Sequence, residues 1–165
     1  MRLGFQDIGP TVTNLELFTE VETILLPGNS ISEIIPKSFR MNTKLQFLSL
    51  ARNQLQCIQN LKHLDSLQFL DLSNNKIEVV ADLNELPVNL LSFKLSDNPI
   101  EQQAKLTGEL AAYRKPFVLH LTQLQDMDKL EIVPAERMSY QGLLPRRVNV
   151  DDMLRKKMRE DEIRK

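Results

Sequence analysis

Cysteine, glycine and aromatic residues are scarce in this sequence, and neither sign of charge predominates. The single cysteine, Cys57, has no partner for an intramolecular disulfide, and no Cys/His cluster around His63 or His120 has the spacing of a metal site. Five glycines leave little room for a glycine-rich phosphate-binding loop. These shortages count against disulfide-stapled scaffolds, metalloenzymes and nucleotide-binding enzymes, and we expect no cofactor.

The charges and the apolar residues also exclude several kinds of partner. Lys and Arg number 21 against 22 Asp and Glu, so the chain has no overall positive field that would attract nucleic acid or an anionic membrane. No run of about 18 uncharged apolar residues is present, and residues 1–10 have neither the basic nor the apolar part of a signal peptide. We therefore expect a soluble, cytoplasmic protein with no nucleic-acid or membrane partner.

Leucine, in contrast, is abundant, at 28 of the 165 residues. One short pattern recurs from residues 21, 45, 67 and 90, with apolar residues at positions 1, 4, 6 and 11 and asparagine at position 9. A period of 22 to 24 residues with this pattern is that of a leucine-rich repeat. The four sets are Val21, Ile24, Leu26, Asn29 and Ile31; Leu45, Leu48, Leu50, Asn53 and Leu55; Leu67, Leu70, Leu72, Asn75 and Ile77; and Leu90, Phe93, Leu95, Asn98 and Ile100.

Each repeat predicts one short strand followed by a turn. Side chains alternate along a strand, so positions 4 and 6 point into the core and positions 3 and 5 point outward. The asparagine follows the strand, where its amide can donate to and accept from the backbone of successive coils. Apolar residues then recur every three positions, which favours 3₁₀ turns. The fold class is therefore an α/β solenoid over residues 21–100, with parallel strands on its concave side and 3₁₀ or short helical turns on its convex side.

The N-terminal end of this solenoid needs a cover, because each coil buries its apolar face only against its neighbours. Residues 1–20 have the apolar spacing of the second half of a repeat, with no strand ahead of it. Two arrangements would close this end. Either Leu3 and Phe5 cap it, or a partner covers it.

The C-terminal end carries its own candidate cover. Leu106, Leu110 and Tyr113 form an apolar stripe that predicts a capping helix from about residue 101 to 114, ended by Pro116. Residues 117–121 follow with a strand-like pattern. One face of the predicted helix would cover the last coil while the other faces water.

Residues 101–137 resemble the C-terminal cap of the short leucine-rich repeat class, whose repeat is about 22 residues long. Members of this class include the regulatory subunit of the type-one phosphatase, a spliceosomal protein and the axonemal dynein light chain. The class usually has glycine where this chain has Lys129, which leaves the turn there less well specified. The resemblance rests on Asn98-Pro99, Tyr113-Arg114, Leu121, Leu124, Met127-Asp128, Val133 and Glu136-Arg137.

The last repeat is similar to that of ciliary and flagellar members of the class. The similar residues are Glu85-Leu86-Pro87, Leu90-Leu91, Leu95-Ser96 and Asn98. This resemblance implies a non-catalytic scaffold in the axoneme of a cilium or flagellum, with protein partners such as tubulin, dynein or radial-spoke components. A phosphatase-regulating or phosphatase-targeting subunit and an RNA-processing scaffold remain as alternatives.

The outward positions of the four strands predict a protein-binding concave face. Phe47 and Phe69 stand at position 3 of adjacent strands, where we expect them to stack and to contact a partner. They could instead shield the edge of the sheet or be covered by the chain's own tail. The predicted face comprises Thr23, Leu25, Phe47, Ser49, Arg52, Phe69, Asp71, Ser92 and Lys94.

Residues 138–165 predict a charged arm. Residues 146–165 contain eight basic and five acidic side chains, whereas the rest of the chain is net acidic. Val150, Leu154 and Met158 form an apolar stripe too narrow to hold an isolated helix. Two interpretations are open: a helix that docks on a neighbouring subunit or on tubulin, or a solvated, frayed tail. The candidate docking residues are Arg146, Arg147, Leu154, Arg155, Lys156, Lys157, Met158 and Arg159.

Overall fold

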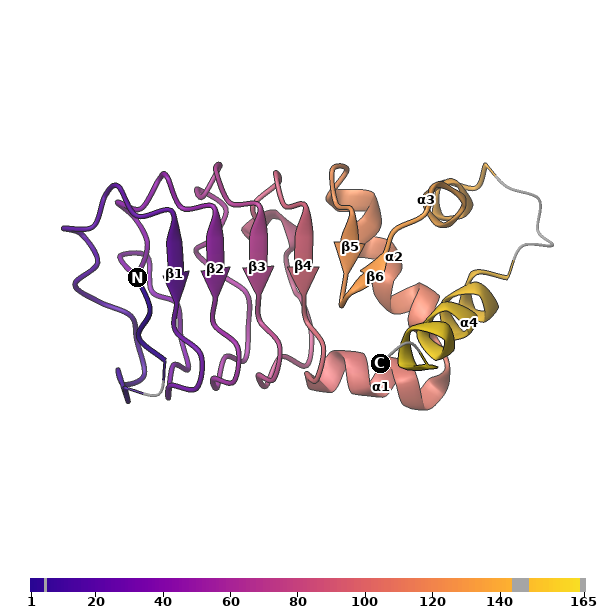
Figure 1. Cartoon of the computed structure of the whole chain (residues 1–165), viewed down its shortest axis with the longest axis horizontal. Coiled ribbons are helices and arrows are strands. Elements are labelled where there is room, and N and C mark those ends of the chain that lie inside the picture. The colour runs from indigo at the N-terminus through magenta and orange to yellow at the C-terminus, as the bar shows by residue number, and fades with distance from the viewer. Residues whose placement is uncertain (5, 144–148, 164–165) are drawn as a thin grey trace.

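Short strands stack in chain order to form one curved sheet (Figure 1). The computed structural model describes residues 1–4, 6–143 and 149–163. Five strands run parallel, and the sixth turns back antiparallel to the fifth. This topology confirms the predicted solenoid. The strands are β1 (Thr23–Leu25), β2 (Phe47–Ser49), β3 (Phe69–Asp71), β4 (Ser92–Lys94), β5 (Asp126–Met127) and β6 (Leu130–Glu131).

The core follows the alternation expected of the repeats. All residues at positions 4 and 6 of the four strands are fully buried. The register places each position-4 residue directly beside its counterpart in the next coil, as Leu48 beside Leu70. Successive coils therefore bury one continuous apolar column and give the chain a stacked core. The buried residues are Ile24, Leu48, Leu70 and Phe93 at position 4, and Leu26, Leu50, Leu72 and Leu95 at position 6.

Four buried asparagines form a ladder along the turn that follows the strands. Asn75 donates from Nδ2 to the carbonyls of Leu50 and Leu72, which lie in two successive coils, at 3.0 and 2.9 Å. Its Oδ1 accepts from the backbone N–H of Leu55 at 3.0 Å. Asn53 and the other ladder residues make the equivalent bonds. The predicted role of asparagine as a bridge between coils is confirmed.

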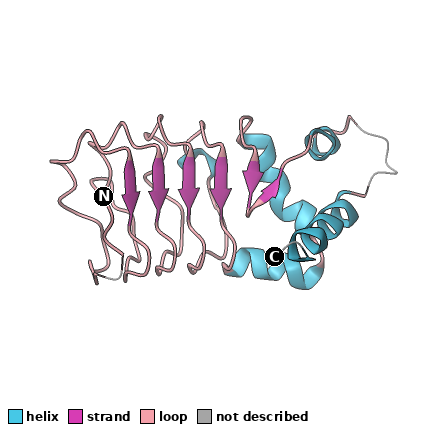
Figure 2. Cartoon of the chain, in the orientation of Figure 1, coloured by secondary structure: helices cyan, strands magenta, loops and turns pink. Residues whose placement is uncertain are grey.

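The convex side consists of turns, as Figure 2 shows. Isolated three-residue turns close it, such as the bond from the N–H of Leu64 to the carbonyl of Leu61 at 3.0 Å. One of these segments is regular enough to form a 3₁₀ helix, η1 (Leu83–Glu85), which is capped by the side chain of Asp82. The three-residue spacing of the sequence therefore corresponds to 3₁₀-type geometry, mostly as single turns.

Residues 1–4 form no strand, as expected of this half-repeat, but they pair with β1 through an isolated β-bridge. Arg2 pairs in parallel with Leu25, and the N–H of Leu3 donates to the carbonyl of Leu25 at 2.8 Å. Backbone pairing needs no leucine pattern, which is why the sequence did not show it. Of the two covers expected for this end, Leu3 and Phe5 or a partner, Leu3 is exposed and Phe5 lies outside the described residues.

The C-terminal cap is built from helices that differ from the expected single one. Gly108, in the left-handed region at φ +76°, ends α1 (Pro99–Thr107), and α2 (Leu110–His120) starts a new direction. Leu106 is 83% exposed, so it does not belong to the buried stripe. Two further helices follow, α3 (Pro134–Tyr140) and α4 (Val150–Ile163). Since α3 runs across residue 137, the cap extends beyond the boundary expected from the sequence.

Pro116 lies inside α2 and does not end a helix, and residues 117–120 are helical where a strand was expected. A proline inside a helix costs about 3 kcal/mol. The buried face of α2 offsets this cost, because Tyr113, Phe117 and Val118 pack on the last coil. None of the described helices is long and apolar enough to span a membrane.

Replacing Asn75 by alanine tests the ladder. The change leaves the buried N–H of Leu55 without its acceptor, and we expect the free energy of unfolding to fall by about 2–3 kcal/mol. Lys76→Ala, at the exposed neighbouring position, serves as the control and should change stability by less than about 0.5 kcal/mol. Urea denaturation followed by circular dichroism measures both, and equal effects would show that the ladder contributes no specific stability.

Candidate functional site

Two aromatic rings dominate the middle of the concave face. Phe47 and Phe69 are register partners on β2 and β3, and their rings stack at a centroid distance of 3.9 Å with 9° between the planes. Each ring is half-buried, so the pair remains partly accessible to solvent. The parallel register causes the stacking, because it places position 3 of adjacent strands side by side. The predicted stack is confirmed.

Charged and polar side chains occupy the cap half of the same face. Lys94 on β4 pairs with Asp71 on β3 at 3.5 Å, and its ammonium lies 4.8 Å from the centroid of the Phe69 ring. Farther along the row, the hydroxyl of Ser92 donates to the carboxylate of Asp126 on β5 at 2.8 Å. The concave face therefore changes from apolar at its centre to polar beside the cap.

The remaining predicted concave residues differ in their accessibility. Thr23 is exposed and Leu25 is half-buried, so both extend the apolar half of the face. Ser49 is only 8% exposed, because its short side chain lies between the longer ones of Leu25 and Asp71, and it cannot serve as a direct contact. Arg52 is exposed in the turn after β2, beyond the strand surface itself.

A buried ion pair holds the cap together. Arg114 on α2 is 2% exposed and donates to both carboxylate oxygens of Glu136 on α3, at 2.7 and 3.2 Å. It also donates to the carbonyl of Met127 on β5 at 2.8 Å, and Tyr140 donates to Glu136 at 3.0 Å. The resemblance implied that Arg114 and Glu136 belong to the cap, whereas only the structure shows that they pair.

A tight turn joins β5 to β6 through Asp128 and Lys129, both at positive φ. This is the position where the related class has glycine, and here lysine adopts the left-handed conformation instead. The carboxylate of Asp128 accepts from the N–H of Leu95 at 2.6 Å and from the hydroxyl of Tyr113 at 2.8 Å. Burial raises the pKa of Asp128 above its usual value, and these two hydrogen bonds partly oppose the rise.

The charged arm packs on the chain's own cap, so neither of the two predicted alternatives describes it. Helix α4 lies against α2 and β6, with Val150 and Leu154 buried in the contact. Asp151 accepts from the N–H of Ala111 in the first turn of α2 at 2.7 Å, and Arg155 donates to the carbonyl of Gly108 at 2.8 Å. The apolar stripe that looked too narrow finds its partner within the same chain.

The other residues proposed for docking have varied surroundings. Lys157 pairs with Glu131 on β6 at 3.1 Å, and Met158 is half-buried against the core. Lys156 and Arg159 are exposed and remain available to a partner. Arg146 and Arg147 lie outside the described residues. In Figure 1 α4 lies at the cap end, away from β2 and β3, so it does not cover the aromatic pair.

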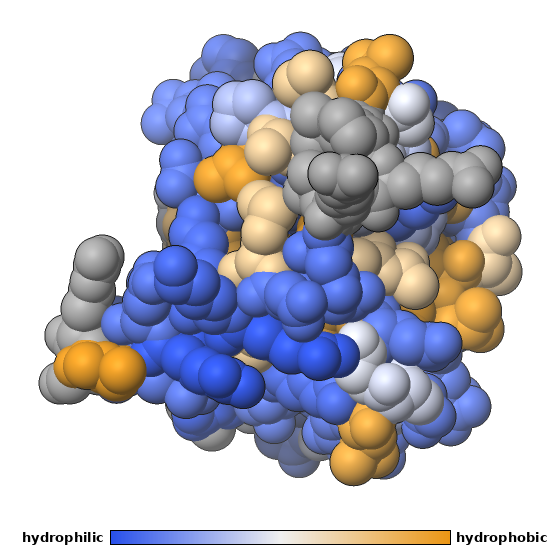
Figure 3. Space-filling model, turned by 90° about the vertical axis from the view of Figure 1, so that its right-hand side faces the viewer, coloured by the Kyte–Doolittle hydropathy of each residue, from blue (hydrophilic) through white to orange (hydrophobic). Residues whose placement is uncertain are grey.

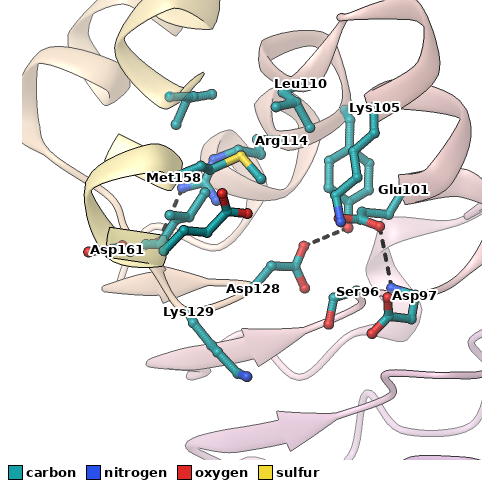
Figure 4. A pocket seen from close by; sticks show the side chains of 14 residues that line it. Ser96, Asp97, Glu101, Lys105, Leu110, Arg114, Asp128, Lys129, Met158 and Asp161 are labelled. Atoms are coloured by element: carbon teal, nitrogen blue, oxygen red, sulfur yellow. Dashed lines mark hydrogen bonds and ion pairs between the residues drawn. The ribbon is translucent and has the colours of Figure 1, made fainter. Parts of the chain in front are cut away.

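A cleft that sequence reasoning missed lies between α1, the β5–β6 turn and α4 (Figure 4). It encloses about 470 Å³ and brings together residues as distant in the chain as Ser96 and Glu162. No local sequence signal marks this cleft, because it exists only through the packing of α4 on the cap. Among the described residues, no group of three or more His, Cys, Asp or Glu side chains is placed to hold a metal ion.

The single cysteine and the two histidines lie in different parts of the fold. Cys57 is exposed on the convex side, where His63 approaches the carbonyl of Phe39 at 3.2 Å. His120 lies in the last turn of α2 and not in a strand-like segment.

Comparison with known proteins agrees with this architecture. A family model described as a leucine rich repeat matches residues 19–77. This chain is a leucine-rich repeat solenoid. Its fold is similar to that of a leucine-rich repeat protein from Leptospira interrogans, with a TM-score of 0.54 and 24% identity over 71% of this chain. The leucine-rich repeat chain spans only 28% of the length of that protein.

A second solved structure that resembles this leucine-rich repeat chain is the SNF/U2A′ complex of Drosophila melanogaster. The match has a TM-score of 0.47 and 19% identity, and it covers 89% of this chain and 68% of the other. Comparison with curated proteins found no match.

The raised pKa of Asp128 predicts a pH-dependent contribution to stability. Because the folded state holds this proton more tightly than the unfolded state, the contribution is complete below pH 3.8 and is lost as the pH rises through the folded-state pKa. We expect the free energy of unfolding of the wild type, relative to Asp128→Asn, to decrease as the pH rises from about 3.8. Urea denaturation at a series of pH values measures this difference.

Tyr113→Phe provides the control for the Asp128 titration. It removes a hydrogen bond that lowers the pKa of Asp128, so the decrease in stability should move to higher pH. A difference between wild type and Asp128→Asn that is constant with pH would contradict the assignment.

The packing of α4 is tested by Leu154→Ala. Leu154 is buried, so its truncation should lower the free energy of unfolding by about 2–4 kcal/mol. Lys156→Ala on the exposed face of the same helix should have an effect below about 0.5 kcal/mol. Urea denaturation, with hydrogen exchange of the α4 amides, measures both; amides of α4 that exchange freely in the wild type would mean that the helix is not docked.

Proposed function

We propose that this protein is a non-catalytic scaffold that binds a protein partner on its concave face. The observation that carries the proposal is the stacked pair of Phe47 and Phe69, which is partly exposed to solvent at the centre of the sheet. Clustered, partly exposed aromatic residues favour protein contact, since covering the remaining apolar area contributes about 25 cal/mol for each Å² buried.

The surroundings of the aromatic pair suit a protein surface. Leu25 and Thr23 extend the apolar area on one side, and the pair of Asp71 and Lys94 provides a polar border on the other. An apolar centre with a polar rim is the usual composition of a protein–protein interface. The mixed charges of this rim do not suit a phosphate backbone, which requires a surplus of positive charge.

The biological setting that we propose is the axoneme of a cilium or flagellum, within the cytoplasm. The last repeat is similar to that of leucine-rich repeat-containing protein 46, a ciliary and flagellar protein, and this resemblance is the support for the setting. Partners there would include tubulin, dynein or radial-spoke components. A phosphatase regulatory subunit and an RNA-processing scaffold are the alternatives. The four regular repeats offer a shorter concave face than a phosphatase subunit of this class normally presents.

The double substitution Phe47→Ala and Phe69→Ala tests the binding face. Both rings are half-buried at the surface, so we expect the fold to persist while the recovery of partners falls about tenfold or more. Affinity purification from ciliated cells, quantified by mass spectrometry, measures the recovery. Val79→Ala with Val88→Ala removes comparable exposed apolar groups elsewhere and should leave recovery unchanged.

Proximity labelling of the wild type in the same cells tests the setting. Axonemal neighbours are expected. Nuclear or phosphatase neighbours without axonemal ones would contradict the axonemal proposal, and unchanged partner recovery by the double Phe variant would contradict the concave-face proposal.

A further inference from the structure

The cleft beside the cap has an apolar floor. Leu110 on α2, Leu130 on β6, and Leu154 and Met158 on α4 line its inner surface. These residues come from three elements that are adjacent only because α4 folds back on the cap. Figure 3 looks at this end of the molecule and shows a largely hydrophilic face with some apolar side chains among the polar ones. The cleft therefore combines an apolar floor with charged and polar residues in the rest of its lining.

The rim of the cleft carries an excess of negative charge. Glu101 pairs with Lys105, and Arg114 is held by Glu136 behind the floor, so these cations are neutralised. Asp97, Asp161 and Glu162 remain on the rim with Lys129, and no ion pair joins these three carboxylates to any other residue that the structure describes. Figure 4 shows Asp97 and Asp161 on opposite sides of the cleft.

The cleft is continuous with the concave face. Ser96 and Asp97 lie two and three residues after Lys94, the last residue of β4, and Asp128 of the lining accepts from the N–H of Leu95 between them. A chain that crosses the aromatic pair toward the cap therefore reaches the cleft after it passes the Asp71–Lys94 pair.

We propose that this cleft binds a lysine- or arginine-bearing segment of a protein partner. The long methylene stem of such a side chain would lie on Leu130, Leu154 and Met158, while its charged head would reach the rim carboxylates. The proposal rests on charge complementarity: a cationic segment is attracted to the rim, whereas an acidic segment is repelled. It deepens the proposed scaffold function by specifying the chemistry of the partner at the cap end of the concave face.

Methionine methyl groups provide a direct probe of binding. The full chain has six methionines, and Met158 lies in the cleft while Met41 is exposed on a distant coil. The test titrates methyl-labelled protein with a peptide of about eight residues that alternates leucine and lysine. We expect the Met158 methyl resonance to shift saturably and the Met41 resonance to stay unchanged. The same peptide with glutamate in place of lysine should shift neither.

Charge reversal on the rim separates specific binding from general attraction. Asp161→Lys with Glu162→Lys, near the end of α4, should weaken peptide binding by about tenfold or more, since cations are tolerated at a helix C-terminus and the fold should persist. Glu16→Lys with Glu78→Lys changes the net charge equally at exposed sites outside the cleft, and should alter affinity by less than about twofold.

Several outcomes would overturn the cleft proposal. One is a Met158 resonance that the lysine peptide does not shift, and another is an equal shift with the glutamate peptide. The others are equal losses of peptide affinity in the two charge-reversal variants, or binding of free spermidine as strong as that of the lysine peptide. The cleft and the concave face can fail separately. We expect Phe47→Ala with Phe69→Ala to leave the peptide-induced shift of the Met158 resonance intact. If partner recovery is also unaffected by that variant, only the concave-face proposal is contradicted.

Discussion

Each coil of this molecule can bury its apolar face and satisfy its turn backbone only against the next coil. The asparagine ladder meets the second requirement, because each buried amide bonds to carbonyls in two successive coils and accepts an N–H from the preceding coil. The fully buried position-4 and position-6 residues meet the first. Register follows from both, and register in turn places Phe47 beside Phe69.

A stack of this kind must be closed where the repeats end. At the C-terminus, closure depends on a network that brings α2, α3 and β5 together through Arg114 and Glu136. Breaking one partner of such a buried pair leaves an uncompensated charge, so the network specifies one arrangement of the cap. Helix α4 adds to this closure by bonding to the junction of α1 and α2 through Asp151 and Arg155. At the N-terminus, an isolated bridge between Arg2 and Leu25 pairs the first residues with β1.

The two candidate binding surfaces arise from different parts of this construction. The aromatic pair belongs to the repeats and lies on the outward side of the strands, where it is partly accessible to solvent. The acidic cleft belongs to the cap and depends on α4 lying against α2 and β6. Together they offer a partner an apolar centre, a polar border and a negatively charged end, which is a more selective surface than a uniform solenoid face.

The sequence by itself determined the repeated part: the positions of four strands, their inward and outward residues, the asparagine bridges and the stacking of Phe47 on Phe69. These follow from the local periodicity of the sequence, because neighbouring coils with the same pattern fold alike and stack in register. Only the tertiary structure decided the C-terminal end, because Pro116 within a helix and the docking of Leu154 depend on contacts between segments that share no period. The cleft also depends on the tertiary structure, since packing of α4 on the cap brings Asp161 opposite Asp97. These residues are far apart in the sequence, and no repeated pattern connects them.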